Sequence, residues 1–146
     1  MKDIGHFVGG RAVAGTSGTY GPIFNPATGE QTGRVAYADA AEVDRVVKAA
    51  QAALPGWSDT PIVRRMRVMF KLKEAIEKNM DRLAMAVTEE HGKTFEDAKG
   101  SVTRGLEVVE FACGIPQLLK GEFSHNVGTG IDLVSARHPV GVCAGI

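Results

Sequence analysis

The sequence predicts an α/β fold in which short strands and hairpins flank about four helices. Between residues 6 and 37, and again from residue 121, short apolar segments are broken by glycine and proline, which is typical of strands and turns. Between these regions, apolar residues recur every three to four positions, which is typical of amphipathic helices. The chain has 146 residues, so we expect about one domain's worth of structure.

The charge balance argues against two classes of partner. Lysine plus arginine number 17, aspartate plus glutamate also number 17, and the formal net charge is zero. A neutral chain offers no general attraction for nucleic acid or for an anionic membrane, so we expect neither partner. No apolar run approaches the ~18 residues of a membrane span, and no signal-peptide core follows the first methionine.

Cysteine and histidine placement bears on compartment and metal binding. Cys113 and Cys143 both lie in apolar stretches, which favours buried free thiols in a reducing compartment over a disulfide framework. The four histidines show no ligand spacing, so we expect no metal site. These features predict a cytoplasmic protein.

Two hairpins are predicted before residue 39. The first pairs His6–Val8 with Arg11–Val13 around two glycines. The second pairs Ile23–Phe24 with Arg34–Tyr37 through the segment NPATGE, in which Gly29 supplies a positive φ. The glycine-rich segment GTSGTYG lacks the spacing and setting of a phosphate-binding loop, and we interpret it as a flexible connection.

The first two helices are predicted from their capping and breaking residues. Asp39 and Glu42 have the spacing of a capping box at the start of the first helix. Pro55 and the glycine after it are expected to end this helix. The second helix is expected to begin with Pro61 as its first residue, because proline has a fixed φ suited to that position.

Two more helices and a final hairpin complete the prediction. The third helix runs from about Asp81 to His91 before a glycine, and the fourth begins after Thr94 and ends before Pro116. Phe123–Val127 and Ile131–Arg137 are expected to form a hairpin. The apolar residues from position 140 onward are expected to form a strand that enters the middle of a parallel sheet.

The fourth helix carries the most informative residue, Arg104. This helix has two apolar stripes on opposite sides, which predicts that it is sandwiched between layers. The stripes are Val102, Leu106, Val109 and Cys113 on one side, and Val108, Phe111 and Ile115 on the other. Arg104 shares the second stripe, and burying an unpaired guanidinium is unfavourable. Either Arg104 pairs with Glu107 or reaches water, or it binds a ligand's carboxylate through its planar fork.

Several ordered segments carry a family resemblance. FNPATGE, GRVAYADAAEVDRVVKAAQAALPGW and RRMRVMFKLKEAIEKNMDRLAMAVTEEHGKTFEDAKG follow one another along the chain. Together they resemble the N-terminal hairpin and first helices of the aldehyde dehydrogenases, including a T-x-E-x-G-K signature. The last segment, RHPVGVCAGI, is similar to the strand that leads into a Pro-Phe/Trp-Asn-Phe-Pro motif in that family.

This resemblance implies an N-terminal part of a longer enzyme. It places residues 1–120 in a Rossmann-like NAD-binding domain, 121–138 in an oligomerisation hairpin and 139–146 at the start of the first core strand. The family's nucleophilic cysteine, general-base glutamate and oxyanion-hole asparagine would all follow Ile146, so no catalytic residue is expected in this chain. Ile146 would touch the edge of the NAD site. Neither Cys113 nor Cys143 matches the nucleophile.

Within the family, the segment GSVTRGLEVVEFACGIPQLLKGE looks most like the acylating methylmalonate-semialdehyde dehydrogenases. In that subgroup, an arginine at the position matched by Arg104 holds the substrate's carboxylate. Ser101 departs from the pattern, since an acidic residue is expected there. The implied reaction oxidises methylmalonate or malonate semialdehyde with NAD and passes the acyl group to coenzyme A with loss of the substrate's carboxylate as carbon dioxide, giving propionyl-CoA or acetyl-CoA.

The resemblance also implies a homo-oligomer, a dimer or tetramer, for the whole enzyme, and an inactive chain when these residues stand alone. Two alternatives stay open at this point. The protein could be an aldehyde dehydrogenase in which water accepts the acyl group. It could also be a truncated, non-catalytic module that acts through its hairpin.

Overall fold

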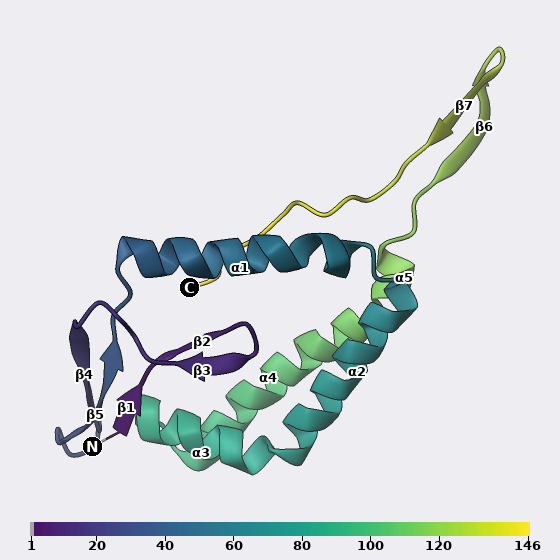
Figure 1. The fold of residues 1–146 in the computed structure, drawn as a ribbon. Coiled ribbons are helices and arrows are strands. Elements are labelled where there is room, and N and C mark those ends of the chain that lie inside the picture. The colour runs from purple at the N-terminus through teal and green to yellow at the C-terminus, as the bar shows by residue number, and fades with distance from the viewer. Residues whose placement is uncertain (1) are drawn as a thin grey trace.

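The computed structural model describes residues 2–146 and has a mixed α/β architecture (Figure 1). Strands β1 (Lys2–Ile4), β5 (Gln31–Ala36) and β4 (Tyr20–Phe24) form a three-stranded sheet in that order. Strands β2 (His6–Val8) and β3 (Arg11–Val13) form a separate antiparallel hairpin. Both hairpins expected before residue 39 are therefore confirmed.

Strand β1 extends the predicted second hairpin into a sheet. It pairs in parallel with β5, and its Asp3 lies opposite Arg34 in register. The Arg34 guanidinium donates two hydrogen bonds to the Asp3 carboxylate, Nε to Oδ1 at 2.9 Å and Nη2 to Oδ2 at 2.8 Å, and it lies 4.3 Å from the centre of the Tyr20 ring. This strand was missed because a three-residue segment has too short a pattern to recognise, and its partner lies about thirty residues away.

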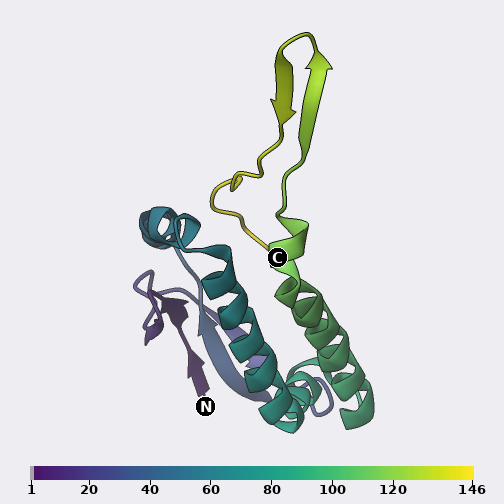
Figure 2. The same ribbon diagram turned by 90° about the vertical axis from the view of Figure 1, so that its right-hand side faces the viewer.

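Five helices follow the sheet. They are α1 (Ala40–Ser58), α2 (Ile62–Lys78), α3 (Met80–His91), α4 (Phe95–Cys113) and the short α5 (Ile115–Leu118). Helices α2 and α4 run antiparallel and in contact, with α3 packed at the end of α4, and Figures 1 and 2 show them as one layer. Helix α1 crosses above this layer, and the C-terminal end of α1 reaches the layer (Figure 1).

Two predicted helix boundaries were wrong. Helix α1 does not end at Pro55 but continues through it to Ser58. Proline removes one backbone donor, yet the following turn still closes, because the Asp59 N–H donates to the Pro55 carbonyl at 3.0 Å. Pro61 is the N-cap of α2 and not its first helical residue, since its ψ of 137° is extended. The predicted ends of α3 and α4 are confirmed to within one or two residues.

The last part of the chain projects away from the helices. Strands β6 (Phe123–Gly128) and β7 (Ile131–Val134) form the expected hairpin beyond α5 (Figures 1 and 2). From residue 135 to 146 the backbone forms no helix or strand, and Val140 is 92% exposed. The strand expected there does not form, because none of the strands between residues 2 and 134 lies beside it to supply hydrogen bonds.

The buried core is small and consists of short side chains. Ala84 on α3 and Ala98 on α4 are fully buried where these helices pack, and Ala36 and Cys113 are the other buried apolar residues. Cys113 is a free, buried thiol as expected, whereas Cys143 is free but exposed, so its predicted burial was wrong. It lies in the segment that was expected to form a strand but has no neighbour to cover it.

Two general features of residues 2–146 bear on function. None of their helices is both long enough and apolar enough to cross a membrane. No three histidine, cysteine, aspartate or glutamate side chains among them are grouped as metal ligands would be.

Candidate functional site

The candidate site is the outward face of α4, where Arg104 lies. The stripe that contains Val102 and Leu106 faces α2 and α3 and is partly covered, and Cys113 at its end is buried. The opposite stripe is open, with Val108 and Phe111 68% and 69% exposed. The predicted packing of α4 between two layers is therefore found on one face only, because residues 2–146 supply a layer on only one side of the helix.

The position of Arg104 on this face follows from how α4 begins. Gly92 ends α3 with a φ of 84°, and Thr94 then caps α4 through its hydroxyl, which accepts from the Asp97 N–H at 3.4 Å. Counting in helical steps from this cap places Arg104 one turn before Val108 on the same face. The cap thus fixes which side of the helix carries the guanidinium.

The guanidinium of Arg104 bonds to a neutral partner. Its Nη2 donates to the Ser101 hydroxyl at 3.2 Å, and it extends back over Gly100, as helical side chains do. In the part of the chain that the structure describes, Arg104 forms no ion pair, so the expected pairing with Glu107 is not found. The Arg104 side chain is exposed and reaches water, which is the other expected alternative. The positive charge of Arg104 is therefore free of a bonded carboxylate.

A second cation stands next to Ser101. The Lys93 ammonium lies 2.8 Å from the Asp97 carboxylate and donates to the Ser101 hydroxyl at 2.8 Å, and its side chain is 19% exposed. The pKa of Asp97 is lowered, mainly by the hydrogen bond and charge of Lys93 and to a smaller extent by the charge of Arg104. Lys93, Asp97 and Arg104 together carry two positive charges and one negative charge, and this local excess of positive charge suits an anionic ligand.

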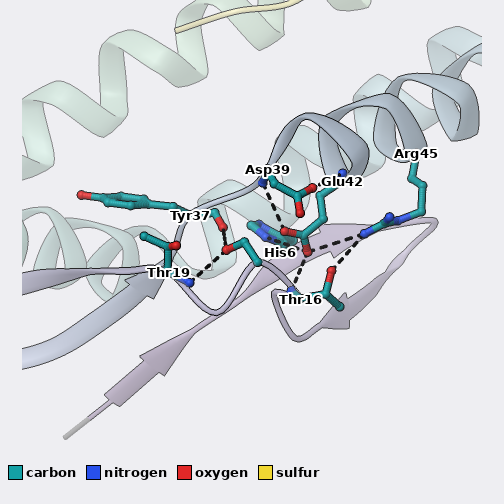
Figure 3. Close-up of polar contacts among 8 residues, drawn as sticks. His6, Thr16, Thr19, Tyr37, Asp39, Glu42 and Arg45 are labelled. Carbon is teal, nitrogen blue, oxygen red and sulfur yellow. Dashed lines mark hydrogen bonds and ion pairs between the residues drawn. The ribbon is translucent and has the colours of Figure 1, made fainter.

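A separate polar cluster surrounds Glu42 at the start of α1 (Figure 3). Glu42 is 4% exposed. Its carboxylate accepts hydrogen bonds from the Thr16 N–H at 2.6 Å and the Asp39 N–H at 3.3 Å, and lies 3.8 Å from both the His6 ring and the Arg45 guanidinium. The Thr16 N–H is the main cause of the lowered pKa of Glu42.

The Glu42 cluster is structural in character. The capping box of Asp39 and Glu42 is confirmed, but the sequence did not reveal that the same carboxylate also binds the glycine-rich segment. That segment is an ordered connection: in addition to Thr16, its Ser17 hydroxyl donates to the Tyr37 carbonyl. The signal that could have indicated this role is the glutamate's position, one turn into a helix that follows directly after a strand.

Ile146 was expected to touch the edge of an NAD site that lies mostly outside these residues. Ile146 is the last residue of the chain, its side chain is fully exposed, and it belongs to no strand or helix. Its predicted contact with NAD remains a prediction.

Comparison with known proteins gives the family. The family model described as "Aldehyde dehydrogenase family" matches residues 13–146. The chain belongs to the aldehyde dehydrogenase family. The resemblance seen in the ordered motifs is thereby confirmed, and so is the expected mixed α/β architecture of the N-terminal part of this fold.

Similar proteins within the aldehyde dehydrogenase family carry consistent names. A malonate-semialdehyde dehydrogenase of Pseudomonas aeruginosa is 44% identical over 146 residues, which is all of this chain and 29% of that protein. A mitochondrial acylating methylmalonate-semialdehyde dehydrogenase of Arabidopsis thaliana is 47% identical over 143 residues, or 98% of this chain and 24% of that protein. The chain therefore spans only 24–29% of the length of these two relatives.

Solved structures agree with this placement in the family. A Sinorhizobium meliloti protein assigned as a methylmalonate-semialdehyde dehydrogenase, solved with NAD, is 51% identical and superposes with a TM-score of 0.93 over 97% of this chain and 29% of its own. A methylmalonate-semialdehyde dehydrogenase of Oceanimonas doudoroffii is 46% identical with a TM-score of 0.89, over 93% of this chain and 28% of its own.

Proposed function

We propose that the protein to which these residues belong is an NAD-dependent, acylating dehydrogenase of methylmalonate or malonate semialdehyde, and that Arg104 binds the substrate's carboxylate. The observation that carries this proposal is a guanidinium with no ion-pair partner in the described chain, held on an apolar helix face. An aldehyde that bears a carboxylate at its other end matches both features, since the charge pairs with Arg104 and the carbon chain lies against apolar residues.

The role of Arg104 is to orient the substrate. A bidentate pair between a guanidinium and a carboxylate fixes the direction of the whole molecule, and so determines which end lies away from α4. Val108 and Phe111 continue the same face from Arg104, and they would contact the apolar part of the substrate. These residues bind and align, and none of them supplies the nucleophile.

The cofactor and the co-substrate are further parts of the proposal. NAD would accept the hydride when bound, and coenzyme A would accept the acyl group, with the names of the related proteins as support. No step is assigned to residues 2–146 for these groups. We also propose a homo-oligomer whose hairpin of β6 and β7 contributes to subunit contact, in keeping with its projection from the helices (Figure 2), and a reducing, cytoplasmic setting that suits two free thiols.

The test is Arg104→Leu in the whole enzyme. Removing one partner of a buried charge pair costs about 2–4 kcal/mol, so we expect KM for methylmalonate semialdehyde to rise by roughly 30- to 900-fold. Propanal, which lacks the carboxylate, serves as the control substrate, and its KM should change little. An unchanged KM for the semialdehyde would exclude Arg104 as the carboxylate ligand.

The acyl acceptor is tested separately. We expect the wild-type enzyme to form propionyl-CoA from methylmalonate semialdehyde when coenzyme A is present, as measured by mass spectrometry of the products. If the enzyme forms a free acid at the same rate with and without coenzyme A, water is the acyl acceptor. That result would exclude coenzyme A as the acceptor.

A further inference from the structure

The Ser101 hydroxyl uses all of its hydrogen-bonding capacity around Arg104. It accepts from Lys93 Nζ at 2.8 Å and from Arg104 Nη2 at 3.2 Å, and it donates to the Asp97 carbonyl at 3.3 Å. A serine hydroxyl has one proton and two acceptor sites, so these three bonds saturate it. Because each bond has a different direction, together they fix the oxygen that the guanidinium contacts.

Lys93 contributes to this arrangement from outside the helix. It precedes the N-cap of α4, yet its ammonium reaches Ser101, about two helical turns beyond the cap. The same ammonium holds the Asp97 carboxylate at 2.8 Å. Asp97 is thus the carboxylate that bonds to Lys93, while Arg104 bonds to a hydroxyl that carries no charge.

We propose that Ser101 is a positioning residue that holds the Arg104 guanidinium ready for the carboxylate of the substrate without neutralising it. This inference rests on the proposed function of Arg104. A hydroxyl directs the side chain and leaves its charge available.

The experiment compares four variants of the whole enzyme. S101A removes the hydroxyl, S101T keeps it, S101C replaces it with a thiol, which is only a weak hydrogen-bond acceptor, and R104L removes the guanidinium. T103A is the matched control, because the Thr103 hydroxyl also bonds back to a helix carbonyl, that of Lys99 at 3.0 Å, but does not contact Arg104. The readout is the ratio of kcat/KM for methylmalonate semialdehyde to kcat/KM for propanal, together with the separate values of KM and kcat.

We expect S101A to lower this ratio roughly three- to tenfold, because a hydrogen bond to a charged group is lost. The loss should fall on KM for the semialdehyde. S101T should restore the wild-type ratio, S101C should lower the ratio as S101A does, and T103A should leave it unchanged. Ser101 is half-buried. If S101A gives no folded enzyme, a higher ratio for S101T than for S101C supports the inference, and equal ratios for these two variants overturn it.

Two results would overturn the inference, and they differ from failure of the proposed function. If S101A keeps the wild-type ratio, or if T103A lowers it as much as S101A does, Ser101 does not position Arg104. In either case a large loss in R104L would leave the proposed role of Arg104 standing. If R104L itself keeps the wild-type ratio, the proposed function fails and the role of Ser101 fails with it.

Discussion

At the scale of single residues, one buried carboxylate ties the first helix to the N-terminal hairpin. Glu42 is almost fully buried and binds the Thr16 and Asp39 N–H groups, with His6 and Arg45 nearby. Figure 3 shows that these partners come from the β2 strand, the glycine-rich connection and α1 itself. The carboxylate therefore stabilises a contact between segments that are far apart in the sequence.

This contact predicts a dependence of stability on pH. The pKa of Glu42 is lowered from its ordinary value of 4.5, first by the Thr16 N–H. A group with a lowered folded pKa stabilises the fold above its unfolded pKa, and this stabilisation is lost as the pH falls through the folded value. We expect Glu42→Gln to lower Tm at pH 7, and the difference from wild type to shrink below pH 4.5.

Thermal unfolding between pH 3 and pH 7 checks this expectation, since it follows both variants through the titration range of a carboxylate, roughly pH 3 to 5. Glu30→Gln is the control, because Glu30 is an exposed glutamate in the turn between β4 and β5. A constant difference in Tm at every pH would show that the ionised form of Glu42 is not what stabilises the contact.

Local sequence rules predicted the contacts between residues close in the sequence but not those between distant residues. The spacing of Asp39 and Glu42 predicted the capping box, because that contact spans only three residues. The bond from Thr16 spans 26 residues, and no periodicity connects such positions. Arg104 was found from its place in an apolar stripe, whereas the contacts of Lys93 with Asp97 and Ser101 appeared only once the turn before α4 was placed.

At the scale of elements, Gly92 joins two parts of the fold. It ends α3 in the left-handed region with a φ of 84°, and a Cβ built on it would lie 2.9 Å from Cγ of Pro26 in the turn after β4. Glycine is thus needed both for the backbone conformation and for the close approach of that turn.

We expect Gly92→Ala to destabilise the chain by about 1–2 kcal/mol from the left-handed conformation alone, and by more if Pro26 cannot move. Gly56→Ala is the matched control. Gly56 lies inside α1 with open space around its Cβ position, so alanine there should stabilise by about 0.5–1 kcal/mol. Urea unfolding of both variants measures the two effects, and equal effects of the two substitutions would contradict the role given to Gly92.

Element boundaries were predictable where a cap determines them. Thr94 and Gly92 marked the ends of α4 and α3 correctly, because their signals are local. The proline rule failed in α1, since the loss of one backbone donor did not prevent the next turn from closing. Strand β1 was missed because its stability comes from pairing with β5 and not from its own three residues.

At the scale of the whole molecule, the chain exposes much apolar surface. The outward stripe of α4 is open at Val108 and Phe111, and the apolar side chains Val43, Val46 and Val47 of α1 are 39–52% exposed. Surface of this kind marks an interaction site or leads to aggregation. The open architecture was implied by the family resemblance, but the number of uncovered faces required the structure.

We predict that a sample consisting of residues 1–146 self-associates. Sedimentation velocity at several concentrations should show an average mass above that of the monomer, 15.5 kDa, and rising with concentration. Replacing Val108 and Phe111 with threonine and glutamine should reduce the association. A monomer at every concentration would show that the exposed stripes do not drive contact.

The central claim is that Arg104 meets a carboxylate. It is tested most directly by a crystal structure of the whole enzyme with malonate or another unreactive dicarboxylate in the substrate site. We expect both oxygens of one carboxylate to lie within about 2.7–2.9 Å of the guanidinium nitrogens, and the Ser101 hydroxyl to keep its hydrogen bond to the Arg104 guanidinium. A bound dicarboxylate held elsewhere, with the Arg104 guanidinium facing bulk solvent, would contradict it.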